Sequence, residues 1–287
     1  WHGVTLFDLL VPAFLFVAGI ATAKSVARRR ANGQSKSEIL SHLIGRCAIL
    51  ILVGIVLGNM SIPELSNLRW LGVLQRIGIC QLAVGSLCLV VDRMIQIVVA
   101  IMILANYGMA FDSFAMAPPA TVSPTRVAQI IDPYSVEYNI AAQIDKAWLP
   151  GRKYQGNWDA QGLLTTLPAF VIMLYGAILN GLFCWRGEAK NRSGIDGRVL
   201  VVSVVLIVVS VFVDYFLQPM NSFLLTPAFV LMALGVCGAV LATLDFKLSS
   251  GMNQDQQCTI VAFGKNSIVM AAIFGLARNT LPELMPY

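Results

Sequence analysis

Eight long apolar runs dominate this sequence and leave few options for its fold. They lie near residues 6–23, 43–59, 71–91, 94–111, 162–184, 199–217, 224–244 and 259–278. A helix that crosses a bilayer needs about 20 mostly apolar residues, so each run is long enough to form one. Only 12% of the 287 residues are charged, about half the usual share in a soluble domain. The sequence therefore predicts an all-α, polytopic transmembrane helix bundle of about eight spans, with residues 1–287 in a single domain.

Positive charge is distributed unevenly between the connectors of this bundle. Most of the Lys and Arg residues lie in or beside the predicted connectors 24–42, 92–93, 185–198 and 245–258. Cytoplasmic loops of membrane proteins carry such an excess, so we place these connectors in the cytoplasm, and both ends of the sequence then face the exterior. The net charge of +5 suits anionic lipid headgroups. Nucleic acid is not an expected partner, because no basic face with interleaved aromatics is present.

The one long connector, residues 112–161, lies on the exterior side in this arrangement. Connectors of this length are usually either functional or disordered. Its aromatic residues and a helix-like stretch from about Val136 to Trp148 favour an ordered segment. We predict that it forms a cap over the exterior end of the bundle and brings Asp159 towards Asp8 and Arg76.

Ionisable side chains inside the predicted spans are the first candidates for function, because charge is costly in lipid. Asp8 lies near the start of the first span, and Gln75 and Arg76 lie one turn inside the third. Both positions map to the exterior end, where the two opposite charges would compensate each other. We expect Asp8 and Arg76 to approach within reach of a salt bridge or of one bridging water. Such a pair would be either a structural ion pair or part of a catalytic pocket.

Two further polar residues map to the same end. Asp159 precedes the fifth span, and Asn221 lies between the sixth and seventh spans. Their convergence with the charged pair predicts a polar pocket. Taken alone, Asp159 also fits the N-cap of a helix that begins near Gln161. His2 is a weak candidate for a general base, since a lone histidine at a chain end is more often incidental.

Basic residues cluster at the cytoplasmic end. Arg28, Arg29 and Arg30 form a run, and Arg46 lies just inside the second span. This cluster would attract the phosphates of a ligand, or it would set the topology and contact lipid headgroups. The six cysteines include no CxxC pair, and we expect no metal site.

Ordered motifs along the chain resemble a known family. The segment Trp1–Gly19 is similar to the W-x-G-x-T-x-x-D-L-x-x-P-x-F-x-F-x-x-G signature of the heparan-α-glucosaminide N-acetyltransferase family and its bacterial relatives. Gly72–Gly78 resembles that family's G-V-L-Q-R-[IL]-G, Asn139–Asp145 resembles N-x-A-A-x-I-D, and Asp159–Leu164 resembles D-P-E-G-[IL]-L. Pro219–Asn221 and Gly264–Ile268 are similar to later landmarks of the family.

The resemblance implies a membrane acyltransferase. Such an enzyme takes an acetyl group from cytosolic acetyl-CoA, its co-substrate, and delivers it to an amino sugar or cell-envelope glycan on the exterior side. For this chain we expect the bacterial inner membrane, Asp8 and Arg76 in the catalytic pocket, and the basic cluster at the CoA phosphates. The expected substrate-binding residues are Gln75, Asp159, Asn221 and Asn266. The expected partners are the lipid bilayer, the acceptor and, as an option, a second copy of the chain in a homodimer.

The sequence departs from the family pattern in three places. The family's proposed catalytic histidine lies a few residues before the tryptophan that matches Trp1, so we expect the base and one preceding helix to lie upstream. We accordingly expect little transfer by these 287 residues alone and activity in a longer natural protein. The motif D-P-E-G reads Asp159–Gly162 here, with an amide at Gln161, and P-x-N-K ends on Ser222, which removes a cation.

Two other classes of function stay open from the sequence. A transporter of a sugar or oligosaccharide would use the same polar residues as its binding site, although no inverted repeat is visible. A membrane scaffold would need no ligand. Consumption of acetyl-CoA distinguishes an acyl-CoA-dependent enzyme from both.

Overall fold

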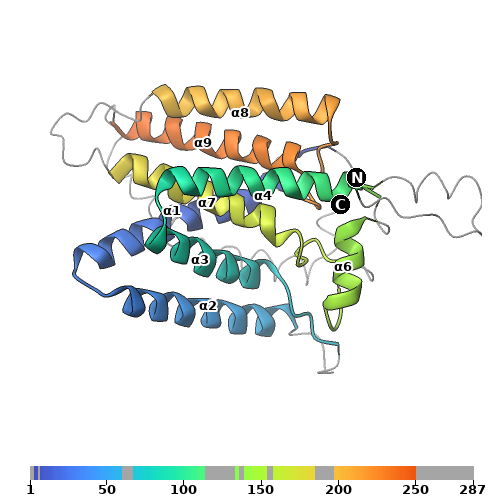
Figure 1. Ribbon diagram of the computed structural model, residues 1–287, viewed down its shortest axis with the longest axis horizontal. Helices are drawn as coiled ribbons and strands as arrows, with labels where there is room; N and C mark the ends of the chain where they lie inside the picture. The colour runs from blue at the N-terminus through green and yellow to red at the C-terminus, as the bar shows by residue number, and fades with distance from the viewer. Residues whose placement is uncertain are drawn as a thin grey trace, which may run out of the picture.

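The computed structural model describes residues 3–5, 7–59, 67–113, 133–135, 139–153, 158–184 and 197–249. Its helices are η1 (Phe7–Leu9), α1 (Leu10–Ala31), α2 (Lys36–Gly58), α3 (Val73–Val90), α4 (Arg93–Ser113), α6 (Ile140–Trp148), α7 (Thr166–Cys184), α8 (Gly197–Phe216) and α9 (Pro227–Ser249). Figure 1 shows the long helices side by side, with α8 at one edge of the bundle and α2 at the other. The short helix α6 lies across one end.

The described helices agree with the predicted class of an all-α membrane protein. Within the described ranges, six helices are long and apolar enough to cross a membrane by length and composition. Helix α7 is a further apolar helix of 19 residues. Seven of the predicted apolar runs coincide with α1 to α4 and α7 to α9, whereas the run near 259–278 lies outside the described residues. The count of eight spans therefore stays a prediction.

The connector between the first two spans is shorter than predicted. We expected a loop over residues 24–42, but α1 continues to Ala31 and α2 begins at Lys36. The prediction was wrong because an apolar run shows only which part of a helix lies in the lipid. Arg, Lys and Ala are good helix formers and readily continue the helix beyond that part. The Ser35 hydroxyl accepts from the backbone N–H of Glu38, and the Glu38 carboxylate accepts from the N–H of Ser35. This capping box fixes the start of α2.

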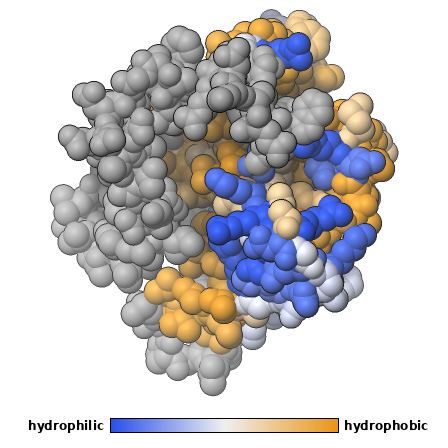
Figure 2. Space-filling view, turned by 90° about the vertical axis from the view of Figure 1, so that its left-hand side faces the viewer, coloured by the Kyte–Doolittle hydropathy of each residue, from blue (hydrophilic) through white to orange (hydrophobic). Residues whose placement is uncertain are grey.

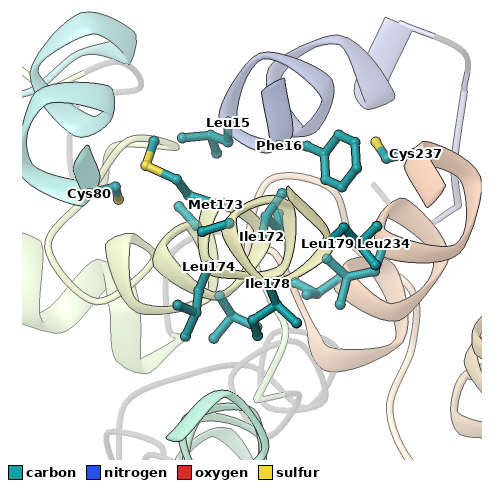
Figure 3. Packing of buried hydrophobic residues seen from close by; sticks show 14 of the residues in the cluster. Leu15, Phe16, Cys80, Ile172, Met173, Leu174, Ile178, Leu179, Leu234 and Cys237 are labelled. Atoms are coloured by element: carbon teal, nitrogen blue, oxygen red, sulfur yellow. The ribbon is translucent and has the colours of Figure 1, made fainter. Parts of the chain in front are cut away.

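Helix α7 is the central helix of the bundle. It contacts α1, α3, α4 and α9, and its residues Ile172, Met173 and Leu174 are fully buried. Figure 3 shows side chains of α7 pointing in several directions, with Leu15 of α1 on one side and Leu234 of α9 on another. A helix that is apolar around its circumference belongs in such a buried position.

Two glycines allow α1 and α7 to cross closely. A Cβ atom at Gly19 of α1 would lie 1.9 Å from the carbonyl oxygen of Met173, and one at Gly176 of α7 would lie 2.1 Å from that of Phe16. The backbone of each helix therefore occupies the space that a side chain would need at the glycine of the other helix. Small residues at helix contacts are the usual means of close packing in membranes.

We predict that Gly19→Ala and Gly176→Ala each lower the free energy of unfolding by about 1–3 kcal/mol, because the added methyl group forces α1 and α7 apart. Thermal unfolding of the purified protein in detergent measures this change. Gly45→Ala on α2 is the matched control, since no atom lies within 4 Å of its added Cβ. The control should be neutral or slightly stabilising. Equal effects at all three positions would contradict the close crossing.

The two ends of the bundle differ in chemical character. We call the end where α6 lies the α6 end; α2, α4 and α8 finish there, and α3, α7 and α9 begin there (Figure 1). The opposite end contains the turn between α1 and α2, and we call it the basic end. Figure 2 looks onto the basic end and shows hydrophilic residues gathered beside apolar helix surfaces. The cations of this turn and the last turns of α1 are Lys24, Arg28, Arg29, Arg30 and Lys36.

Candidate functional site at the α6 end

Arg76 is the most deeply buried cation at the α6 end. It lies in the first turn of α3, which begins at Val73, and it is only 1% exposed. Its Nη2 donates to the carbonyl oxygens of Ala160 at 2.9 Å and Gly162 at 3.4 Å, and to the Thr165 hydroxyl. Residues 159–165, which we call the arginine-binding segment, therefore supply all the hydrogen bonds that the Arg76 side chain makes among the described residues.

Asp145 of α6 holds the arginine-binding segment in place. Its carboxylate accepts from the backbone N–H of Leu163 at 2.9 Å and from that of Asp159 at 3.3 Å. The contact is so close that a Cβ atom at Gly162 would lie 2.0 Å from Asp145 Oδ2. Only glycine fits at position 162 in this arrangement, because any side chain would displace the carboxylate.

Asp145 is fully buried, and burial raises its pKa above the ordinary value near 3.8. The negative charge of Asp159 raises the pKa as well. The N–H groups of Leu163 and Asp159 and the charge of Arg76 lower it, but burial is the largest effect. The carboxyl of Asp145 therefore keeps its proton to a higher pH than a carboxyl in water.

Asp159 forms an ion pair with Arg69, the only ion pair among the described residues. The guanidinium of Arg69 donates through Nε at 2.8 Å and Nη2 at 2.7 Å to the two carboxylate oxygens. Asp159 Oδ1 also accepts from the backbone N–H of Gln161 at 2.9 Å. The side chain of Arg69 is 23% exposed, whereas that of Asp159 is fully buried. This pair joins the arginine-binding segment to the stretch before α3.

The stretch around Arg69 is itself fixed by two neighbours. The Asn59 side chain, at the end of α2, accepts from the N–H of Arg69 at 2.7 Å and donates to its carbonyl oxygen at 3.2 Å. Arg69 also forms an isolated antiparallel bridge with Gly151, which follows α6. Gly151 has a φ of +75°, and a Cβ there would lie 2.0 Å from the Leu68 carbonyl oxygen. The end of α2, the start of α3 and the region after α6 thus form one connected structure.

The expected ion pair between Asp8 and Arg76 is absent. The Asp8 carboxylate accepts from the backbone N–H and the hydroxyl of Thr5, both at 2.8 Å, and so closes the turn before α1. The Arg76 guanidinium instead donates to carbonyl oxygens of the arginine-binding segment, and the negative charges of Asp159 and Asp145 compensate its positive charge. The direct salt bridge does not form, because equal depth on two helices does not specify which side of a helix faces the other, and a contact through one bridging water stays a prediction.

Gln75 and Asn221 are both buried at the α6 end. Atoms of the Gln75 side chain lie where Cβ atoms of Gly54 and Gly72 would be, so Gln75 fills the contact between α2 and α3. The Asn221 side chain accepts from the N–H groups of Phe223 and Leu224, both at 2.9 Å. In these contacts Asn221 shapes the turn between α8 and α9. Binding of a substrate by either residue stays a prediction.

The predicted phosphate-binding arginines lie at the basic end. Lys24, Arg28 and Arg29 line an open depression of about 500 Å³, together with Asn32 and Gln34. Arg29 donates to the Gln34 side-chain oxygen at 3.0 Å and lies 2.9 Å from His42 Nε2. A guanidinium only donates, so His42 Nε2 must be the unprotonated acceptor. Two side-chain contacts therefore hold Arg29 beside Gln34 and His42.

The remaining candidates divide into two groups. Arg30 is exposed and Arg46 is half-buried, and neither lines the depression. His2 and Asn266 lie outside the described residues.

Sequence reasoning missed three contributors to the site, Arg69, Asp145 and Thr165. Two of them, Asp145 and Arg69, stand at positions in the sequence that could have indicated a role in the site. Asp145 ends the stretch Asn139–Asp145, in which Asn139 caps α6 through the N–H of Ala142. Arg69 stands in the short connector before the third span. Thr165 carried no signal, because a threonine at the start of an apolar run is common.

The fold and the site together define a class. The apolar helices indicate a polytopic integral membrane protein, with a buried arginine–aspartate cluster at one end and an arginine-lined depression at the other.

Comparison with known proteins gives a partial match. No family model matches the chain. Over 91 residues the chain is 33% identical to heparan-alpha-glucosaminide N-acetyltransferase of Mus musculus and 34% identical to that of Homo sapiens. The match covers 30% of this chain and 14% of each relative. The chain thus matches only a small part of each relative, and this similarity supports a related family at most.

We predict that the free energy of unfolding of the wild type decreases, relative to that of Asp145→Asn, as the pH rises above about 3.8, the ordinary pKa of an aspartate carboxyl. The folded state holds the Asp145 proton more tightly than the unfolded state does, because its pKa is raised. As the pH rises from the ordinary carboxyl pKa through the raised pKa of the folded state, Asp145 loses its proton, and the stabilisation from that proton is lost. Unfolding free energies of both proteins, measured from pH 3.5 to pH 7, test the prediction. A wild type that gains on the variant as the pH rises would contradict it.

Proposed function

We propose that this protein is a membrane acetyltransferase that moves the acetyl group of acetyl-CoA to the amino group of an amino sugar or cell-envelope glycan. The observation that carries the proposal is the partial similarity to two N-acetyltransferases. The geometry supports it in two ways, through the buried polar cluster at the α6 end and the cations that line the depression at the basic end.

The proposed reaction joins an amine to a thioester carbon. The amine nitrogen attacks the acetyl carbonyl carbon, a C–N bond forms and the C–S bond breaks. The proton lost by the amine passes through a base to the thiolate, so the products are an amide and free CoA. Negative charge develops on the carbonyl oxygen during the attack, and fixed donors that face this oxygen accelerate the step. Arg76 is the most deeply buried cation in the described chain, and we assign it to this region of the site.

The two ends suit the two substrates. The depression at the basic end offers Lys24, Arg28 and Arg29 to the phosphates of CoA, since cations and phosphates attract. Helix α1 separates the ends by about 33 Å, the length of 22 residues at 1.5 Å each. In the proposed enzyme the CoA phosphates bind at the cytoplasmic basic end and the acceptor binds at the α6 end, facing the exterior. The arm of CoA that carries the thioester then reaches into the bundle towards the α6 end, where the amine attacks.

An assay of CoA release tests the function. We expect the natural protein, reconstituted in proteoliposomes, to release free CoA from acetyl-CoA only when an amino sugar such as glucosamine is present. Glucose is the matched control, because it lacks the amine. Uptake of sugar without any CoA release would show a transporter instead, and the proposal would be wrong.

A second prediction concerns the basic end. Arg28→Gln and Arg29→Gln should each raise the KM for acetyl-CoA about tenfold with little change in kcat, since each removes one charge-assisted contact to a phosphate. The matched control is Arg93→Gln, an exposed arginine at the same end that does not line the depression. Unchanged KM values in both variants would place the CoA phosphates elsewhere.

A further inference from the structure

Two buried polar atoms of the site have no hydrogen-bond partner in the described chain. They are Arg76 Nε, a donor, and the Gln161 side-chain oxygen Oε1, an acceptor. Leaving such groups unpaired away from water is costly. A ligand that supplies both an acceptor and a donor would satisfy both atoms.

The two atoms belong to one small region. The Nη2 of Arg76 donates to the carbonyl oxygens of Ala160 and Gly162, the two residues that flank Gln161. All the side-chain hydrogen bonds of Arg76 in the described chain come from Nη2, so Nε–H is left for another acceptor. The backbone of Gln161 is fixed by its bond to Asp159 Oδ1. The donor and the acceptor therefore belong to one hydrogen-bonded group of residues, formed by Arg76 and the arginine-binding segment.

The charge of the cluster limits the kind of ligand. Its two cations, Arg69 and Arg76, are balanced by two carboxylates, Asp145 and Asp159. A bound carboxylate or phosphate would add an uncompensated charge in a buried place, which is unfavourable. A neutral group with a carbonyl oxygen and an N–H keeps the balance, and a secondary amide is such a group.

We propose that Arg76 and Gln161 bind the N-acetyl amide of the acetylated product. The Nε–H of Arg76 donates to the amide carbonyl oxygen, and Gln161 Oε1 accepts from the amide N–H. This assignment rests on the proposed function and specifies its chemistry. During transfer the N–H that stays on the attacking nitrogen donates to Gln161. The carbonyl oxygen, which gains negative charge as the C–N bond forms and the C–S bond breaks, is held by Arg76.

Binding of two matched sugars tests the proposal without any turnover. N-acetylglucosamine has a secondary amide, whereas N-acetyl-N-methylglucosamine keeps the carbonyl oxygen and lacks the N–H. We expect calorimetry on the natural protein in detergent to show about tenfold tighter binding of the first sugar, the effect of one buried hydrogen bond. Gln161→Met should abolish this preference, because its side chain has a similar length and no oxygen. Arg76→Lys should weaken both sugars about equally.

The controls keep the test decisive. Asn106→Leu removes an exposed amide from α4 and should preserve the preference. The preference is the ratio of the two sugars' Kd values, and it is measured separately on each protein. Partial unfolding of Arg76→Lys therefore does not affect the result for Gln161→Met. Equal binding of the two sugars by the wild type, absence of binding, or a preference that survives in Gln161→Met would overturn the proposal. A protein that shows the preference but releases no CoA would overturn the acetyltransferase function and leave the amide site standing.

Discussion

The burial of one guanidinium governs the α6 end of this protein. Arg76 stands inside a helix that is apolar enough to cross a membrane, and a charge in that position needs compensation. Its hydrogen bonds go to the carbonyl oxygens of Ala160 and Gly162 and to the Thr165 hydroxyl. Carbonyl oxygens can serve in this way only if their backbone is held still. Asp145 and the Arg69–Asp159 pair supply that restraint, one from α6 and one from the stretch before α3.

The bundle places this cluster through α7, which begins at Thr166, directly after the arginine-binding segment. The close crossing at Gly19 and Gly176 fixes α7 against α1, and α3 packs on both helices. The start of α7 is thereby held near the start of α3, where Arg76 lies. Packing among apolar helices thus determines where a polar segment can meet a buried charge. Two glycines in the crossing of α1 and α7 therefore help to determine where the candidate functional residue Arg76 meets its partners.

The arrangement suits a reaction whose substrates approach from opposite sides. The basic end offers cations that line an open depression, while the α6 end offers a buried cluster with balanced charge. In the described chain this cluster retains one unpaired donor and one unpaired acceptor. A structural ion pair alone would be most stable with every polar atom satisfied. The unpaired atoms are therefore the part of the cluster that a purely structural role does not explain.

The sequence by itself determined the helices, because the length of an apolar run is set by the thickness of the lipid and the capping pattern of Ser35 and Glu38 is local. It also indicated that Arg76 needs a partner. It did not determine which partner, and Asp8 forms no salt bridge with Arg76, since depth along two helices leaves their rotation and lateral neighbours undefined. The partners of Arg76 follow it by 84 to 89 residues in the chain. Only the tertiary structure brought them together, because backbone carbonyl oxygens occur at every residue and become specific only when packing fixes them in space.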